Sequence, residues 1–202
     1  DIAYRLMIPA IKKHRGYELI SVASRDFSKA KKFAKKFNCL AEKDYNSIIE
    51  NNEIEAVYIP LPNGVREYWI LKALKAYKHV LSEKSIVMNL NSARKIIKCA
   101  SNHKNRIIFE NFMFLNHCQH NFVLNKINEG FIGEIVSINS NFSIPKPNSN
   151  NIRLKKNLGS GALYDLGSYN IRLAIFLLGK ELKLVKYDKI EIKGIDTYGF
   201  LI

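Results

Sequence analysis

The stretch Ala56-Val-Tyr-Ile-Pro-Leu-Pro-Asn-Gly-Val-Arg-Glu-Tyr-Trp-Ile-Leu-Lys-Ala-Leu-Lys-Ala-Tyr-Lys-His-Val-Leu-Ser-Glu-Lys84 decides the fold class. It predicts an apolar strand at 56–59, a proline and glycine turn at 60–64, a helix at 65–77 and a second strand at 79–82. Two strands joined by a crossover helix are the unit from which parallel sheets are built. The stretch therefore predicts an α/β layer.

The same alternation extends along the chain in both directions. The further elements that it predicts are helices at 3–14, 28–37, 45–50 and 92–101, and strands at 18–24 and 106–110. Ser28 is the expected N-cap of the second helix, because its hydroxyl can accept a backbone hydrogen bond. Strands that alternate with helices predict a doubly wound, Rossmann-type parallel sheet, which we assign to a first domain at 1–111.

The pattern changes around Phe112. A helix at 119–129 is followed by a longer alternating strand at 133–142, by a loop rich in Pro and Asn at 143–151, and by a last strand at 197–202. This succession predicts a second domain of the α+β class at 112–202.

Composition narrows the class of protein. A chain of 202 residues can bury a sizeable core, and no apolar run approaches the roughly 20 residues that span a bilayer. The first 20 residues lack the single apolar block of a signal peptide, so we expect a cytoplasmic protein without a membrane partner. Cys39, Cys99 and Cys118 have no metal-type spacing and are expected to be unpaired thiols, and no metal site is predicted.

The chain is strongly basic, with 32 Lys and Arg against 18 Asp and Glu and a formal charge of +14. These cations are scattered over the polar faces of predicted helices, which favours a solvated surface and suits an anionic cofactor and substrate. We therefore predict no nucleic-acid partner. A basic nucleic-acid-binding module, with salt-sensitive binding, is the alternative from a different functional class.

Two short motifs carry candidate chemistry. The run Gly159-Ser-Gly-Ala-Leu-Tyr-Asp-Leu-Gly-Ser-Tyr-Asn170 sets Asp165 and Tyr169 four residues apart, so that both share one helix face. Strand 79–82 delivers Glu83 and Lys84 at its carboxyl end, where open α/β sheets bind ligands. Lysine, tyrosine and aspartate together suggest chemistry at a carbonyl group.

These motifs resemble the Gfo/Idh/MocA family of nicotinamide-dependent oxidoreductases. The stretches that carry the resemblance are Ala23–Asp26, Val57–Asn63, His79–Lys84 and Gly159–Tyr169. It implies an N-terminal Rossmann domain and a C-terminal domain built on an open, mostly antiparallel sheet. A narrower similarity, to reductases of 3-keto groups on nucleotide-linked (dTDP) deoxysugars, is carried by Glu110–His120, Phe142–Pro147 and Asn151–Arg153.

The resemblance implies a cofactor site. Ser24 and Arg25 would meet the adenosine ribose, and a basic residue there suits the 2′-phosphate of NADP rather than NAD. Pro60, Leu61, Pro62 and Asn63 would line the nicotinamide side, beside Glu83 and Lys84.

The resemblance also implies catalytic roles. Lys84 would stabilise developing alkoxide and lower the pKa of a neighbouring phenol, and Tyr169 would donate the proton. Asp165 would orient Lys84 or bind a sugar hydroxyl, and His117 would contact the substrate. A nucleotide-sugar substrate and a homo-oligomer through the second-domain sheet are the implied partners.

The chain departs from the family pattern in several places. It lacks the first strand and the glycine-rich phosphate loop, and it starts inside a helical pattern and stops inside a strand pattern, so we expect both ends to be incomplete. Four residues also differ from the pattern: Arg66, Ser85, Cys118 and Ser160. Ser85 stands where proline is usual and gives freedom next to Lys84. The alternatives are a dehydrogenase of another polyol or trans-dihydrodiol and an inactive remnant.

Overall fold

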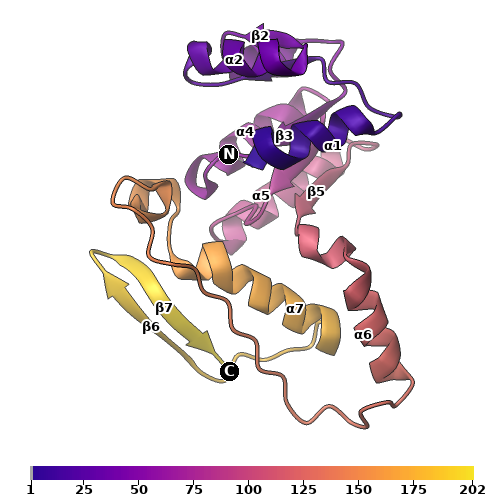
Figure 1. The fold of residues 1–202 in the computed structure, drawn as a ribbon, viewed down its shortest axis with the longest axis vertical. Helices are drawn as coiled ribbons and strands as arrows, with labels where there is room; N and C mark the ends of the chain where they lie inside the picture. The colour runs from indigo at the N-terminus through magenta and orange to yellow at the C-terminus, as the bar shows by residue number, and fades with distance from the viewer. Residues whose placement is uncertain (1) are drawn as a thin grey trace. The chain divides into compact units, whose positions relative to one another are not determined.

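The computed structural model describes residues 2–202 and divides them into two compact units. The first unit comprises 2–61, 67–82 and 91–109, and the second comprises 62–66, 83–90 and 110–202. Figure 1 shows the helices and strands of both as a ribbon. Each unit is built from segments that are far apart in the sequence.

The first unit holds parallel strand pairs. Its strands are β1 (Ser21–Ala23), β2 (Leu40–Glu42), β3 (Ala56–Ile59), β4 (His79–Glu83) and β5 (Ile108–Asn111), the last two of which run on into the second unit. Strand β1 pairs in parallel with β2, and β3 pairs in parallel with β4 in the register Ala56 to His79. The order β3-β4-β5 makes a three-stranded sheet, separate from the β1-β2 pair in the described chain. The α/β class with a parallel sheet is thus confirmed, although the sheet lies in two pieces.

Helices accompany these strands. They are η1 (Ala3–Met7), α1 (Ile8–Lys13), α2 (Phe27–Phe37), α3 (Tyr45–Glu50), α4 (Asn63–Lys75) and α5 (Leu90–Asn102). Ile70 and Leu74 of α4 have no exposed surface and Val80 of β4 is 2% exposed. Burial of each such side chain contributes about 1.5–3 kcal/mol, so this cluster is the core. Trp69 of α4 meets the ring of Tyr45 edge-on at 5.0 Å.

The N-cap of α2 differs from the prediction. The helix begins at Phe27, and the Asp26 carboxylate accepts hydrogen bonds from the backbone N–H groups of Ser28 and Lys29. An N-cap side chain reaches the second and third helical residues, so Asp26 occupies that position and Ser28 lies inside the helix. The prediction that Ser28 caps the helix was wrong.

The second unit combines helices with an antiparallel hairpin. Its elements are η2 (Met113–Asn116), α6 (Cys118–Asn128), η3 (Ile152–Leu154), η4 (Lys156–Leu158), η5 (Leu163–Gly167), α7 (Ser168–Leu178), β6 (Tyr187–Ile192) and β7 (Ile195–Leu201). Strand β7 covers most of the predicted strand at 197–202. It pairs antiparallel with β6, which the sequence did not predict.

The predicted strand at 133–142 is absent from the structure. Those residues follow an irregular path, and Val136 is 96% exposed. A strand needs a neighbour to satisfy its backbone groups, and no segment within 2–202 pairs with this one. The alternating pattern alone was therefore a misleading signal.

Two further features concern the cysteines and the character of the helices. Cys39, Cys99 and Cys118 are all free thiols. Among residues 2–202, none of the helices has both the length and the apolar character that a membrane crossing requires.

Candidate active site

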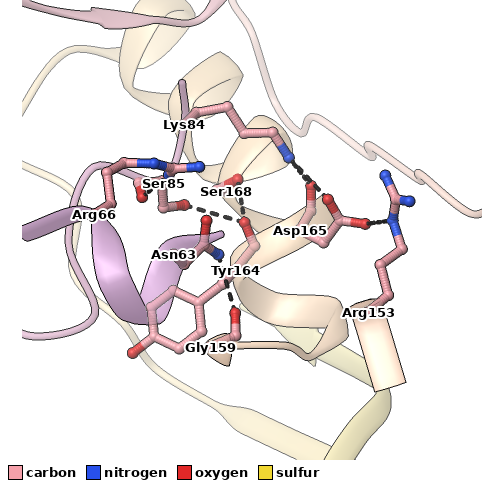
Figure 2. Close-up of polar contacts among 9 residues, drawn as sticks. All are labelled: Asn63, Arg66, Lys84, Ser85, Arg153, Gly159, Tyr164, Asp165 and Ser168. Carbon is pink, nitrogen blue, oxygen red and sulfur yellow. Dashed lines mark hydrogen bonds and ion pairs between the residues drawn. The ribbon is translucent and has the colours of Figure 1, made fainter. Parts of the chain in front are cut away.

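Lys84 leaves the carboxyl end of β4 and points at Asp165. Its ammonium donates a hydrogen bond to Asp165 Oδ1 at 3.1 Å and another to the Asp165 backbone carbonyl (Figure 2). The two side chains are 11% and 24% exposed. The strand end and the helical segment thus bring together the lysine and the aspartate that the sequence singled out.

Tyr169 completes the cluster. The Lys84 ammonium lies over its ring, 4.5 Å from the centroid, in a cation–π arrangement. Asp165 in η5 and Tyr169 in α7 are one helical turn apart, and both contact Lys84. The predicted shared face therefore exists, and it is directed at the lysine.

Aromatic rings enclose Tyr169. Phe112, Phe114 and Phe142 lie with their ring centroids 5.8, 5.6 and 5.2 Å from that of Tyr169. Burial raises the pKa of Tyr169 above 10.0, and the negative charges of Glu83 and Asp165 add to the rise. The sequence predicted the opposite direction, because it placed a cation beside the phenol without the ring cage that excludes water.

Arg153 is a second cation on Asp165. Its Nε donates to Asp165 Oδ2 at 2.5 Å, on the side of the carboxylate away from Lys84 (Figure 2). Burial would raise the pKa of Asp165, but the Arg153 hydrogen bond and the charges of Lys84 and Arg153 hold it below 3.8. Asp165 is therefore ionised at neutral pH.

The pKa of Lys84 is shifted in the same direction for a different reason. Burial lowers it below 10.5, and the Asp165 carboxylate offsets only part of that effect. Arg153 lowers it further through its positive charge. Lys84 is a partly desolvated ammonium, the form that interacts strongly with a developing negative charge.

The glycine run approaches the start of α4 closely. Asn63 Nδ2 donates to the Gly159 carbonyl at 3.1 Å. Gly159 has φ +69°, and a Cβ there would lie 2.7 Å from the Gly64 nitrogen, so any other residue would collide with backbone. The Ser160 hydroxyl next to it is buried and has no hydrogen-bond partner within the described residues.

Other predicted site residues lie in the first unit or make structural hydrogen bonds. Ser24 and the exposed Arg25 follow β1 in the first unit, where Ser24 Oγ accepts from the Asp26 nitrogen. His117 is exposed and caps α6, with Nδ1 accepting from the Gln119 nitrogen.

The other predicted cofactor residues belong partly to the first unit and partly to the second. Pro60 and Leu61 follow β3 in the first unit, while Pro62 and Asn63 belong to the second. Glu83 also lies in the second unit, and it accepts a hydrogen bond from Asn111 Nδ2 at 2.8 Å. These residues are therefore divided between the two units.

Known proteins share this architecture. The Gfo/Idh/MocA oxidoreductase family with an NAD-binding Rossmann fold matches residues 2–112, and the C-terminal domain of the same family matches residues 122–193. The chain belongs to the Gfo/Idh/MocA family. The resemblance inferred from the sequence is thereby confirmed.

Several similar members of the family are named as sugar reductases. Two curated relatives are both named dTDP-3,4-didehydro-2,6-dideoxy-α-D-glucose 3-reductase. That of Saccharopolyspora spinosa is 41% identical over 89% of this chain and 54% of its own length. That of Actinomadura kijaniata is 38% identical over 92% of this chain and 55% of its own. The chain thus spans about half the length of the relatives it matches.

A solved structure is similar over the whole chain. KijD10, a 3-ketoreductase from Actinomadura kijaniata determined with NADP and TDP-benzene, superposes with a TM-score of 0.96 at 35% identity. The match covers 100% of this chain and 62% of KijD10.

Proposed function

We propose that the protein is an NADP-dependent oxidoreductase that reduces a ketone on a nucleotide-linked deoxysugar. The observation that carries this proposal is the cluster of Lys84, Asp165 and Tyr169, in which one nearly buried ammonium contacts both a carboxylate and a phenol ring. The names of the similar reductases support the substrate class.

The residues present suit two ends of the cofactor. Arg25 is exposed at the carboxyl end of β1, where a guanidinium would bind the 2′-phosphate of NADP beside Ser24. Pro60, Leu61 and Pro62 follow β3, and together with Asn63 at the start of α4 they would line the nicotinamide. Glu83 at the end of β4 and Lys84 just after it would lie beside them. When bound, the reduced cofactor supplies the hydride.

The site residues divide the remaining work. Lys84 holds its ammonium where the ketone oxygen becomes an alkoxide and stabilises that charge. Tyr169, whose raised pKa keeps it protonated at neutral pH, donates the proton to the alkoxide. Arg153 holds the Asp165 carboxylate, and this carboxylate in turn holds the Lys84 ammonium next to the Tyr169 ring. Proton donation of this kind contributes on the order of 10²–10⁴ in rate.

The test is NADPH consumption by the full-length protein with a nucleotide-linked 3-keto sugar, compared with simple polyols and dihydrodiols in the reverse direction. We expect turnover of the nucleotide sugar, and a loss of roughly 10²–10⁴ in kcat for Tyr169→Phe. The exposed Tyr17→Phe variant is the matched control. Turnover of polyols alone would move the assignment to a polyol dehydrogenase, and unchanged kcat in Tyr169→Phe would remove the proton-donor role.

Fluorescence titration with NADPH and NADH tests the cofactor separately. Tighter binding of NADPH, lost in Arg25→Glu, is the expected result. Absence of binding to either nucleotide, together with absence of turnover, would favour an inactive protein.

A further inference from the structure

The short segment that follows Lys84 is tied down by buried side chains. Ser85 is 9% exposed, and Arg66 of α4 is 4% exposed. The Arg66 guanidinium donates from Nη1 to the Ser85 backbone carbonyl (Figure 2). Arg66 and Ser85 are two of the four positions at which the sequence departs from the family pattern, and here they meet in one hydrogen bond.

A carboxylate holds the next residue. Glu110 of β5 accepts a hydrogen bond from the Ile86 backbone N–H at 2.7 Å. Burial raises the pKa of Glu110, while that hydrogen bond and the positive charges of Arg66, Arg172 and Lys84 oppose the rise. Arg66 and Glu110 thus fix consecutive residues of the segment and attract each other.

The same segment is bonded to the residue before Asp165. Ser85 Oγ donates to the Tyr164 carbonyl at 3.0 Å, and the Tyr164 hydroxyl donates to the Met88 carbonyl at 2.5 Å. The main chain on each side of the Lys84–Asp165 pair is therefore joined by further hydrogen bonds. A displacement of Ser85 would therefore move both Lys84 and Asp165.

Lys84 needs such support because its side chain is a flexible four-carbon stem. The position of the ammonium depends on where its Cα is held, and a misplacement of about 1 Å at a catalytic group costs on the order of 10² in rate. We propose that Arg66, Ser85 and Glu110 are positioning residues that clamp the segment 84–86 and thereby aim Lys84 at Asp165 and the reacting oxygen. This inference rests on the proposed function, in which Lys84 acts on the ketone.

The kinetic test compares variants that remove a bond with variants that keep it. Arg66→Met and Glu110→Leu delete the two clamping groups, and we expect kcat to fall roughly 10- to 100-fold with KM changed less than about 3-fold. Glu110→Gln keeps an oxygen acceptor for the Ile86 N–H and should recover most of the activity. The exposed Arg94→Met variant is the control for loss of a guanidinium. Equal losses in Glu110→Gln and Glu110→Leu would overturn the role assigned to Glu110.

A second readout does not need turnover. Competitive acetylation, followed residue by residue with mass spectrometry, measures how freely each lysine reacts. Lys84 is nearly buried and should react slowly in the wild type, and several-fold faster in Arg66→Met and Glu110→Leu, while the exposed Lys95 is unchanged. Unchanged Lys84 labelling in both variants would overturn the proposal.

The two proposals fail in different ways. If Lys84→Met and Tyr169→Phe keep full activity, the proposed function is wrong, whatever the labelling shows. If those two variants are inactive but Arg66→Met matches Arg94→Met in kcat and in Lys84 labelling, the clamp alone is wrong. Circular dichroism of each variant distinguishes a local change from loss of the fold.

Discussion

The ammonium of Lys84 is subject to two opposing effects. Burial lowers its pKa, and the Asp165 carboxylate raises it, with burial the larger effect. Tyr169 is shifted the other way, upward from 10.0, by the same exclusion of water. Burial therefore moves the pKa of Lys84 down and the pKa of Tyr169 up.

The pH dependence of kcat should reflect the lowered pKa of Lys84. We expect activity to decline at alkaline pH as Lys84 loses its proton, at a pH below 10.5. Arg153→Met removes a charge that lowers the Lys84 pKa and should move the decline to higher pH, whereas Asp165→Asn should move it lower. Stopped-flow pH profiles check this, with Arg94→Met as the control. Shifts of both variants in one direction would contradict the assignment.

Stability should also respond at Asp165. Its pKa is lowered in the folded protein, so the carboxylate contributes stability above its ordinary value of 3.8 and loses that contribution as the pH falls through the lowered pKa. Asp165→Asn should cost about 1–3 kcal/mol at pH 7, because the nearly buried Lys84 loses its counter-ion. Urea unfolding at pH 7 and pH 3 checks this. A cost that grows on acidification would show that the sign is wrong.

The sequence singled out Lys84, Asp165 and Tyr169, which the structure brings together, but not their surroundings. Lys84 follows an apolar strand, and Asp165 and Tyr169 have helical spacing, which are local signals. Arg153 lies in the short helical turn η3 and Asp165 in η5, and the chain between them has no regular period, so no spacing rule could pair them. Burial by the phenylalanine rings, which raises the Tyr169 pKa, likewise depends on tertiary packing.

Among the elements, the hairpin β6–β7 supports the helical segment that carries Asp165. The Asp196 carboxylate of β7 accepts a hydrogen bond from the backbone N–H of Leu163, the first residue of η5, at 2.6 Å. The first N–H groups of a helix lack partners within it, and a negative charge there is favourable. Asp196 thus acts as a cap supplied from a distant part of the chain.

Removal of this cap should weaken the helical segment. Asp196→Ala is expected to cost about 0.5–2 kcal/mol, the usual range for an N-cap, and Asp196→Asn less because its amide oxygen still accepts. Thermal unfolding followed by circular dichroism measures both. The control is Asp188→Ala on the exposed β6. An equal effect of Asp188→Ala would mean that Asp196 has no capping role.

The accuracy of the element predictions depended on how local each signal was. Helices at 63–75 and 90–102 and strands at 56–59 and 79–83 lie within a few residues of their predicted bounds. The strand expected at 133–142 failed because pairing is a tertiary property. The β6–β7 hairpin was only half predicted, since its first strand mixes charges with apolar residues.

At the scale of the whole molecule, the candidate catalytic residues belong to a single unit. Lys84, Asp165 and Tyr169 all lie in the second unit, although Lys84 follows a strand of the parallel sheet. The sequence-based boundary after residue 111 stays a prediction.

Self-association is the prediction at this scale. Ile190, Ile192 and Tyr198 on the hairpin are 58%, 59% and 56% exposed. If this sheet forms the predicted homo-oligomer, Ile190→Lys should shift the protein toward monomer in sedimentation velocity, since a buried charge is costly. Ile97→Lys, at an exposed position in the first unit, is the control. Concentration-independent sedimentation of the wild type as a monomer would contradict it.

The packing of Trp69 against Tyr45 gives the chain a built-in optical reporter. It is the only tryptophan of this sequence, and it lies in the first unit. Its emission on selective excitation therefore reports solvent access to α3 and α4 in the first unit, while far-ultraviolet dichroism reports the helices of both units. The two signals can be recorded on one sample during denaturation. If one unit melts before the other, the two transitions will have different midpoints.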